Sequence, residues 1–332
     1  MMTVKKTSIV NATGYDPYVN LAAEELLLNR LAPDEAMLYL WQNQHTVVVG
    51  RNQNAWRECH VENLHSDSGR LARRLSGGGA VYHDLGNLNF TFLLSKQAYD
   101  LHRQLKVIVN AAREVGIQAE FSGRNDILAG GRKFSGNAFY HGQNSSYHHG
   151  TILVDVDMSR LANYLNVPSA KMTTKGVSSV QSRVVNLREF VPALSIPDMK
   201  LALIKSFVAE YGGGGEQYSL ADFMDTTEFK DLHDKYSSWD FRFGKSPHFD
   251  TTYETRFPWG GIEIGLAVTG GVVKAARIYS DAMESGSIEL MADSLLGCHF
   301  ERAHLALRLQ EISRLHNSPL VAEVATWLKN EA

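Results

Sequence analysis

The chain has 332 residues, enough for two domains or for one large domain with a substantial core. Hydrophobic residues make up 44% and charged residues 21%, as in ordinary globular proteins, and no run approaches the roughly 18 apolar residues of a membrane helix. A formal net charge of −3 excludes the basic field that non-specific nucleic-acid binding requires.

Cysteine usage indicates the compartment. The chain contains only Cys59 and Cys298, far apart and in unrelated contexts. This usage fits a reducing environment and predicts neither a disulfide framework nor a zinc site. The first ten residues hold no apolar stretch of signal-peptide length. We therefore expect a cytoplasmic protein with two structural thiols.

The first half of the chain alternates between helix and strand patterns. Asp16 and Pro17 are typical of an N-cap and a first helical position, so a helix is predicted over residues 18–31. A second helix is predicted over residues 99–115, ended by Gly116. Runs rich in β-branched and aromatic residues predict strands at 36–41, 46–50, 70–74, 80–83, 88–94, 127–140 (interrupted by Gly130-Gly131) and 147–154.

The second half begins with helical patterns at residues 158–165 and 197–211. Gly212–Gly215 follows directly and lacks neighbouring Lys, Ser or Thr, so it predicts a helix stop and a turn. Gly244–Pro247 marks a domain boundary. Beyond it, strands are predicted at 262–268 and 272–279, and helices at 287–296, 303–314 and 319–329. The sequence thus predicts a catalytic domain at residues 1–244, a linker at 245–251 and an accessory domain at 252–332.

The most informative segment runs from Arg73 to His83. Three consecutive glycines expose backbone N–H groups with no side chains in the way, which suits close approach of an anion or a planar ligand. The arginines before them can add charge-assisted contacts to phosphate or carboxylate. A flexible hairpin turn with two solvated arginines is the alternative.

Further polar segments lie at residues 123–126, 133–136, 148–151 and 175–183. Each has a structural alternative: Asp126 could cap a turn, and Lys133 could be a solvated surface lysine. His148-His149 suggests a metal site, but adjacent residues of a strand point to opposite faces and cannot bind one ion. We expect one of the two to face the interior and the other to face solvent.

Several familiar catalytic motifs are absent from the sequence. There is no Gly-x-Ser-x-Gly elbow of a serine hydrolase, no P-loop and no dinucleotide fingerprint.

The ordered set of segments nevertheless resembles a known family. Arg-Arg-x-Ser-Gly-Gly-Gly-Ala-Val-Tyr-His-Asp, Gly-Arg-Asn-Asp, Lys-Phe-Ser-Gly, His-His-Gly-Thr and Lys-Gly-Val-x-Ser-Val-x-Ser-Arg-Val occur in this order, as in lipoate–protein ligases of the biotin/lipoate ligase superfamily. The resemblance runs from about residue 15 to residue 241 and continues into the Arg-Phe-Pro-Trp-Gly-Gly segment at 256–261. It implies an α+β fold with a large mixed or antiparallel sheet flanked by helices, plus a small α+β C-terminal domain.

The resemblance also implies a two-step reaction. Lipoate and MgATP give lipoyl-AMP and pyrophosphate, and a lysine of an apo lipoyl domain, in a 2-oxoacid dehydrogenase E2 subunit or a glycine cleavage H protein, then takes the acyl group. ATP and Mg²⁺ enter as cosubstrates, with no tightly bound cofactor. Positive charge and backbone donors must offset the repulsion between carboxylate and polyphosphate.

The family pattern assigns roles to residues of this chain. Lys133 is the implied catalytic residue, an electrostatic stabiliser of the developing oxyanion, and Asp126 the implied Mg²⁺ ligand. The segment at 175–183 resembles a loop that covers the adenylate. The implied ATP and lipoyl-AMP contacts are Arg74, Ser76, Gly77, Gly78, Gly79, Ala80, Val81, Tyr82, His83, Asn125, Asp126, Lys133, His149, Gly150, Thr151, Lys175, Gly176 and Ser179. The expected lipoate contacts are Leu21, Leu75, Val81, Lys133 and His149.

Other functions remain open at this point. An octanoyltransferase that uses a cysteine thioester is disfavoured, because Cys59 and Cys298 lie outside every motif. A lipoyltransferase that takes a preformed acyl donor shares the motifs and is excluded less well. Biotin ligation is disfavoured, because the biotin-type Gly-Arg-Gly-Arg loop is absent. A non-catalytic lipoate or adenylate sensor has no need of both Lys133 and Asp126.

Overall fold

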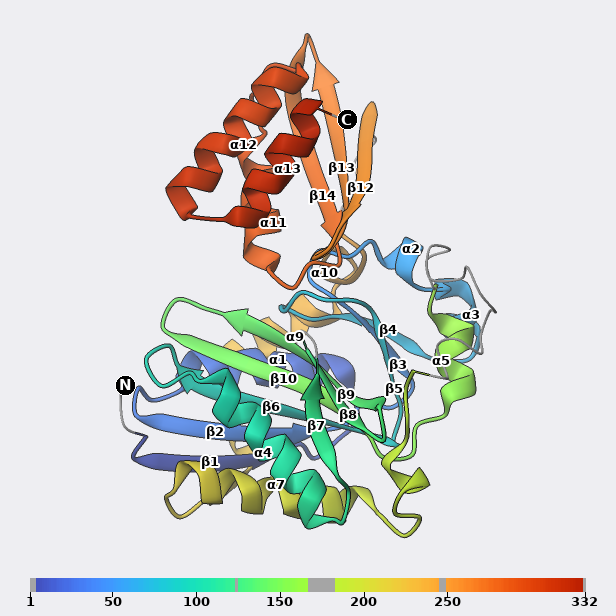
Figure 1. The fold of residues 1–332 in the computed structure, drawn as a ribbon, viewed down its shortest axis with the longest axis vertical. Coiled ribbons are helices and arrows are strands. Elements are labelled where there is room, and N and C mark those ends of the chain that lie inside the picture. Colours follow the sequence, from blue (N-terminus) through green and yellow to red (C-terminus); the bar gives the residue numbers. More distant parts are fainter. Residues whose placement is uncertain (1–3, 123–124, 167–182, 245–248, 331–332) are drawn as a thin grey trace. The chain divides into compact units, whose positions relative to one another are not determined.

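The computed structural model describes residues 4–122, 125–166, 183–244 and 249–330. Figure 1 shows its helices and strands. The chain forms two compact units: a large unit of residues 1–48, 56–73 and 80–242, and a small unit of residues 49–55, 74–79 and 243–332. The glycine run at 77–79 therefore groups with the C-terminal residues, which the sequence does not indicate.

The large unit is built on an eight-stranded mixed sheet. Its strands in spatial order are β11 (Glu216–Ser219), β1 (Lys6–Asn11), β2 (Glu35–Trp41), β6 (Asn87–Ser95), β10 (Ser145–Leu153), β9 (Arg132–His141), β8 (Asp126–Ala129) and β7 (Ala119–Ser122). β1 runs parallel to both of its neighbours, and the other pairs are antiparallel. The predicted fold class is confirmed.

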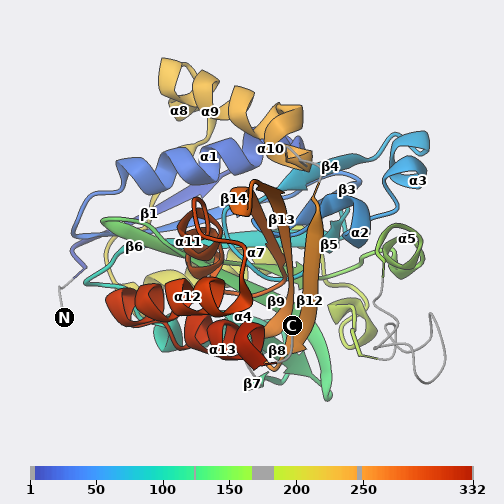
Figure 2. The ribbon, with the colours of Figure 1, turned by 90° about the horizontal axis from the view of Figure 1, so that it is seen from above.

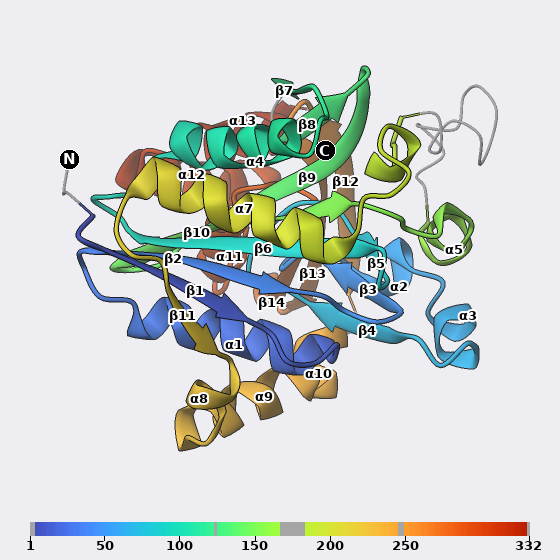
Figure 3. The same ribbon diagram turned by 90° about the horizontal axis from the view of Figure 1, so that it is seen from below.

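Helices cover both faces of this sheet. α4 (Leu101–Glu114) and α7 (Ile196–Tyr211) lie side by side on one face, as Figure 3 shows. On the other face, α1 (Pro17–Arg30) packs against β6 and β10, and α9 (Thr227–Ser237) lies beside α1 (Figure 2). Lys235 of α9 bonds both carboxylate oxygens of Glu25, at 2.8 and 2.7 Å.

Local sequence signals explain where these helices begin and end. The Asp16 carboxylate accepts the Tyr18 amide at 2.8 Å and so caps α1, as predicted. α4 is capped in the same way by Asp100. α7 begins at a capping box and ends at Gly212, whose φ of +77° suits glycine.

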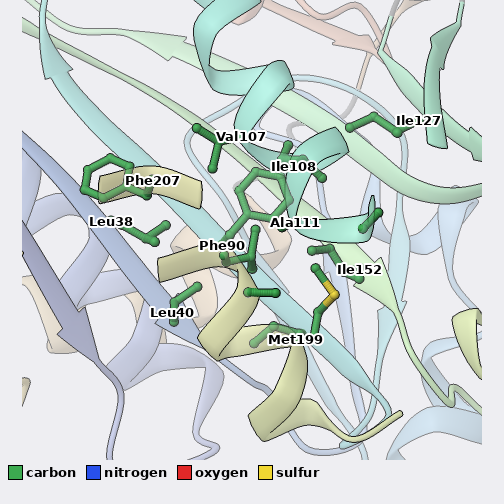
Figure 4. Close-up of a cluster of buried hydrophobic side chains, with 14 of the residues drawn as sticks. Leu38, Leu40, Phe90, Val107, Ile108, Ala111, Ile127, Ile152, Met199 and Phe207 are labelled. Atoms are coloured by element: carbon green, nitrogen blue, oxygen red, sulfur yellow. The ribbon is translucent and has the colours of Figure 1, made fainter. Parts of the chain in front are cut away.

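The apolar core of the large unit lies between the sheet and α4 and α7. Figure 4 shows side chains from both helices and from the strands of the sheet meeting there. They are Leu38, Leu40, Phe90, Val107, Ile108, Ala111, Ile127, Ile152, Met199 and Phe207.

Shorter elements complete the large unit. β3 (Thr46–Val49), β4 (Arg70–Arg73) and β5 (Val81–His83) form a second sheet in the order β4-β3-β5. The short helices are α2 (Ala55–Glu58), α3 (Val61–Ser66), α5 (Met158–Tyr164), η2 (Leu187–Glu189), α8 (Ala221–Met224) and α10 (Trp239–Phe243).

The C-terminal part of the small unit is a three-stranded antiparallel sheet with helices on one side (Figure 1). Its elements are β12 (Thr251–Phe257), β13 (Gly260–Thr269), β14 (Val272–Ser280), α11 (Ser285–Ser294), α12 (Arg302–His316) and α13 (Pro319–Asn330). The predicted alternation at 262–268 is confirmed, because Ile262, Ile264 and Leu266 are buried in the core.

One expectation about the histidine pair is wrong. His148 and His149 do point to opposite faces of β10, but both are buried, with 0% and 6% of their surface exposed. The reason is that each ring has a partner on a covering helix: His148 contacts Gln104 of α4, and His149 contacts Glu24 of α1. A single sequence does not show that other elements pack on both faces of a strand.

Within the described residues, we find no helix with the length and apolar character needed to span a bilayer.

Candidate active site

Polar side chains of the large unit gather on the face of the sheet that α1 covers. The register places Thr151 of β10 opposite Asn89 of β6, and Asp126 of β8 opposite Gly136 of β9. The Gly136 amide donates to Thr151 Oγ1 at 3.3 Å, which joins these pairs into one row across four strands. Because side chains alternate along a strand, all members of this row face the same side.

Lys133 reaches this row because of an irregularity in β9. The β8–β9 register shifts by one residue between Ile127, which pairs with Ser135, and Leu128, which pairs with Lys133. The additional residue, Phe134, is fully buried in the apolar core. Such a bulge turns the next side chain to the opposite face, so Lys133 lies on the same side as Gly136.

An ion pair marks the open part of the row. Lys133 Nζ lies 2.7 Å from Asp126 Oδ1, and the side chains are 33% and 38% exposed. A Cβ at position 136 would lie 2.9 Å from the lysine Cε and Nζ, so glycine makes room for the lysine chain. The Gly130-Gly131 turn, with φ of +54° and +73°, closes the hairpin that joins the two partners.

The residues after the predicted covering loop pair with Lys133. The Lys133 amide donates to Arg183 O, and the Val185 amide donates to Lys133 O, both at 2.9 Å. Lys175, Gly176 and Ser179, expected to contact the adenylate, lie outside the described residues, as does Arg124.

A buried hydrogen-bond chain lies one row further along the same face. His149 Nδ1 donates to Glu24 Oε1 at 2.8 Å, and Thr91 Oγ1 donates to the same oxygen at 2.7 Å. Trp41 Nε1 in turn donates to Thr91 Oγ1 at 3.0 Å. Glu24, from α1, is only 1% exposed, so two donors compensate the burial of its charge.

Sequence reasoning placed His149 in the site but missed its partners. Glu24 lies on the same helix face as Leu21 and Leu28, three and four residues away. A carboxylate at an apolar position of an amphipathic helix was the available signal. No signal pairs it with His149, which is 125 residues away.

β5 contributes the predicted nucleotide segment within the large unit. Ala80 and Val81 are half-buried, whereas Tyr82 and His83 are buried. Asn43 Nδ2 donates to His83 Nδ1 at 3.2 Å, which fixes the imidazole. Burial raises the pKa of Tyr82 to about 12, so its hydroxyl stays protonated at neutral pH.

The glycine run is held by contacts inside the small unit. The Arg74 guanidinium donates to the loop's own carbonyls, Gly77 O at 2.7 Å and Gly79 O at 2.8 Å, and to Ser76 Oγ at 3.0 Å. The Gly78 amide donates to Ala282 O at 3.1 Å. Arg74 thus shapes the loop.

Close approach of the backbone explains the glycine at position 77. A Cβ there would lie 2.2 Å from Ala282 O and 2.6 Å from Met283 O. Gly78 has a φ of +89°, which disfavours other residues.

The expected lipoate-lining residues occur in both units. Leu21 of α1 is fully buried, and Val81 of β5 is half-buried, both in the large unit. Leu75 belongs to the small unit and is 5% exposed.

Neither cysteine has the character of a nucleophile. Cys59 is buried, and burial raises its pKa to about 12. Cys298 is half-buried, and burial raises its pKa as well. A thiolate nucleophile needs the opposite shift. Among the described residues, no group of three or more His, Cys, Asp or Glu side chains could hold a metal ion.

Comparisons with known proteins identify the family. Residues 16–208 match the family described as the lipoyl protein ligase A/B catalytic domain, and residues 246–328 match the bacterial lipoate protein ligase C-terminus. A relative named lipoate-protein ligase A, from Psychrobacter cryohalolentis, is 39% identical, covering 98% of this chain and 99% of the relative. The chain therefore belongs to the lipoyl protein ligase family and is a ligase.

Solved structures of similar fold agree with this. P. falciparum LipL1 in complex with lipoate has a TM-score of 0.86 at 28% identity, covering 98% of this chain and all of that one. An archaeal bi-partite lipoate protein ligase with its E2 lipoyl domain, from Thermoplasma acidophilum, has a TM-score of 0.65 at 26% identity, covering 74% and 99%. A lipoate-protein ligase A bound with ATP has a TM-score of 0.61 at 26% identity, covering 73% and 99%.

Proposed function

We propose that this chain activates lipoate with MgATP to lipoyl-AMP and transfers the lipoyl group to a lysine of an apo lipoyl domain. The observation that supports this most directly is the Lys133–Asp126 pair, held by a bulge on an open polar row of the sheet. The names of the family and of the similar structures, with lipoate, ATP and an E2 lipoyl domain, support the substrates and the acceptor.

Lys133 acts as an electrostatic catalyst in this proposal. Attack of the lipoate carboxylate on the α-phosphate develops negative charge, and so does attack of the acceptor amine on the acyl carbonyl. A fixed ammonium stabilises both better than water does, because it needs no reorganisation during the reaction. One third of the Lys133 side chain is exposed, which is compatible with contact to a substrate.

Asp126 is the proposed Mg²⁺ ligand. Mg²⁺ in nucleotide sites usually takes one or two protein carboxylates and completes its shell with phosphate oxygens and water. A single carboxylate, 38% exposed, with Asn125 next to it, fits this donor set. When bound there, Mg²⁺ would neutralise charge on the polyphosphate.

The remaining polar contacts are proposed to position the substrates. His149 and Thr151 extend the row along β10, Gly150 lies between them in the strand, and β5 provides backbone groups to the nucleotide. The glycine run, which belongs to the small unit, carries backbone donors of its own, shaped by Arg74. Leu21 and Val81 of the large unit suit the dithiolane tail.

A lipoyltransferase that uses a preformed acyl donor is the second candidate. The same charge pair would serve its transfer step, so the site alone does not separate the two. The raised pKa values of both thiols disfavour a cysteine thioester route.

One assay separates the candidates. The purified chain is incubated with lipoate, MgATP and an apo lipoyl domain, and pyrophosphate and lipoylated acceptor are followed separately. We expect both products. Transfer from supplied lipoyl-AMP alone would favour the transferase, and binding without turnover would favour a sensor.

A further inference from the structure

The side of β9 opposite Lys133 holds a second set of polar contacts. Three hydrogen bonds join Asn137 of β9 to Asn125, the residue immediately before β8. The Asn137 amide and its Nδ2 both donate to Asn125 O, at 3.0 and 2.9 Å, and Asn125 Nδ2 donates to Asn137 O at 2.9 Å. This clamp extends the β8–β9 ladder past Asp126 and fixes the backbone from which the Asp126 side chain departs.

His148 of β10 contacts this clamp from the side of the sheet that α4 covers. Its Nε2 lies 2.8 Å from Asn137 Oδ1, and its Nδ1 lies 3.1 Å from Gln104 Oε1 of α4. Asn137 uses Nδ2 to reach Asn125, so its Oδ1 must accept a proton from the imidazole. Burial holds the pKa of His148 well below its usual value, so the ring is neutral and carries its proton on Nε2. Nδ1 of the neutral ring carries no proton, so the Gln104 amide must turn its Nε2, in place of Oε1, toward it.

The packing leaves this arrangement little freedom. His148 is fully buried, and the rings of Phe139, Phe90 and Phe92 lie 5.0, 5.5 and 5.7 Å from it. Gly150 lies opposite Asn137, where a Cβ would lie 2.9 Å from Asn137 Oδ1. The glycine therefore provides the space that the Asn137 amide occupies.

We infer that Asn137 and His148 are positioning residues that set the Asp126 end of the Asp126–Lys133 pair from the opposite face of the sheet, through the main chain of Asn125. The inference rests on the proposed function, since it assigns these residues to the MgATP end of that site. Neither side chain touches the pair itself. Loosening them should impair use of MgATP and leave lipoate binding intact.

The test is lipoate-dependent ATP–pyrophosphate exchange with His148→Phe, which keeps the packing and removes the Nε2 proton. Loss of one buried hydrogen bond should raise the KM for MgATP about tenfold, with the KM for lipoate changed by about twofold or less. His148→Gln, which can still donate to Asn137, should have a KM for MgATP close to that of the wild type. Asn137→Ala, which removes the side-chain bonds to Asn125 and His148, should reproduce His148→Phe.

His141→Phe is the matched control. It removes a histidine contact, to Ser146 Oγ at 3.0 Å, from the same two strands but away from the clamp, and should leave both KM values unchanged. Hydrogen exchange at the Asn137 amide should accelerate in His148→Phe and not in the control.

The outcomes separate the two proposals. A wild-type chain without lipoate-dependent exchange overturns the proposed function. An active wild type whose His148→Phe and Asn137→Ala variants fold and keep the wild-type KM for MgATP overturns the positioning role. Equal increases in the KM for MgATP and in the KM for lipoate would indicate a merely structural role and would also overturn the positioning role.

Discussion

The two faces of the large sheet use the same strands for opposite purposes. On the face covered by α4 and α7, alternate residues of β6 and β10 such as Phe90 and Ile152 form a dry core. On the face covered by α1, the residues between them include Thr91 and His149, which bond to Glu24. The two-residue period of a strand thus separates stability from chemistry within one sheet.

The comparison teaches that burial alone does not make a core. Thr91 and His149 are as deeply buried as many apolar residues, but each hydrogen-bonds to a partner on another element. Burial strengthens such contacts and makes any unpaired member costly. Apart from the contacts of His148 and Asn137, the first face should therefore respond to lost volume, and the second to lost donors or charges.

The largest expected effect on stability is on the apolar face. Phe90→Ala removes a fully buried ring that contacts Phe92 and His148 and leaves a cavity. We expect the free energy of unfolding to fall by about 3–5 kcal/mol, measured by urea denaturation. A loss below about 1 kcal/mol, with the fold retained, would contradict the description of this face as a packed core.

On the polar face, the largest expected effect is on catalysis. Lys133→Ala should lower lipoyl-adenylate formation by about 100- to 1000-fold, as removal of an oxyanion-stabilising donor does. Thermal unfolding should change little, because the side chain is partly exposed. Pyrophosphate release by stopped-flow measures the effect.

The neighbouring Arg132→Ala serves as its control. Arg132 bonds Glu189 at 2.7 Å on the protein surface, so its loss should leave pyrophosphate release near wild type. If Lys133→Ala retains most of the wild-type rate, its electrostatic role is wrong.

Local features of both faces could be predicted from the sequence. The Asp16 cap, the helix stop at Gly212 and the Gly130-Gly131 turn depend on neighbouring residues, and each lies where the pattern indicates. The strands β1, β7, β11 and β12 were missed; of these, β7 and β11 are short and mostly exposed and show no apolar period. Alternation of apolar and polar residues identifies a strand that is buried on one side, and it gives no signal for a strand that is exposed on both sides.

The site could be predicted only in part, because its geometry depends on distant residues. The motifs indicated Lys133 and Asp126 as site residues, but the bulge at Phe134 that turns the lysine to the polar face has no sequence signature. Likewise, the clamp between Asn137 and Asn125 depends on register. Register follows from the pairing of whole strands, which one sequence does not show.

A smaller effect is expected from Glu24→Gln. The neutral amide oxygen still accepts from His149 and Thr91, but the bonds lose the assistance of charge, so the free energy of unfolding should fall by about 1–2 kcal/mol. Denaturation of the double variant with Thr91→Val should show a non-additive loss, since both residues share one oxygen.

Glu25→Gln, one residue along the same helix, is the control for this prediction. Its partner Lys235 is 36% exposed, so the ion pair is partly screened and its loss should change stability by about 1 kcal/mol or less. Equal losses at positions 24 and 25 would mean that the buried chain adds nothing beyond an ordinary surface pair.

The smallest expected effect is on pH dependence, where the two faces are coupled through His148. Its folded-state pKa lies well below the unfolded value of about 6.5, so above that pH both states are neutral and stability is unaffected. As the pH falls below about 6.5, this histidine becomes protonated in the unfolded chain but stays neutral in the folded chain. The free energy of unfolding therefore decreases by at most about 1.4 kcal/mol per pH unit for this group. Burial lowers the pKa of His45 and His141 as well, so His148→Phe should reduce the slope without abolishing it. Denaturant titrations at pH 7.5 and 5.5 measure this, and an unchanged slope in the variant would mean that His148 is charged in the folded protein and cannot hold Asn137 as a neutral donor.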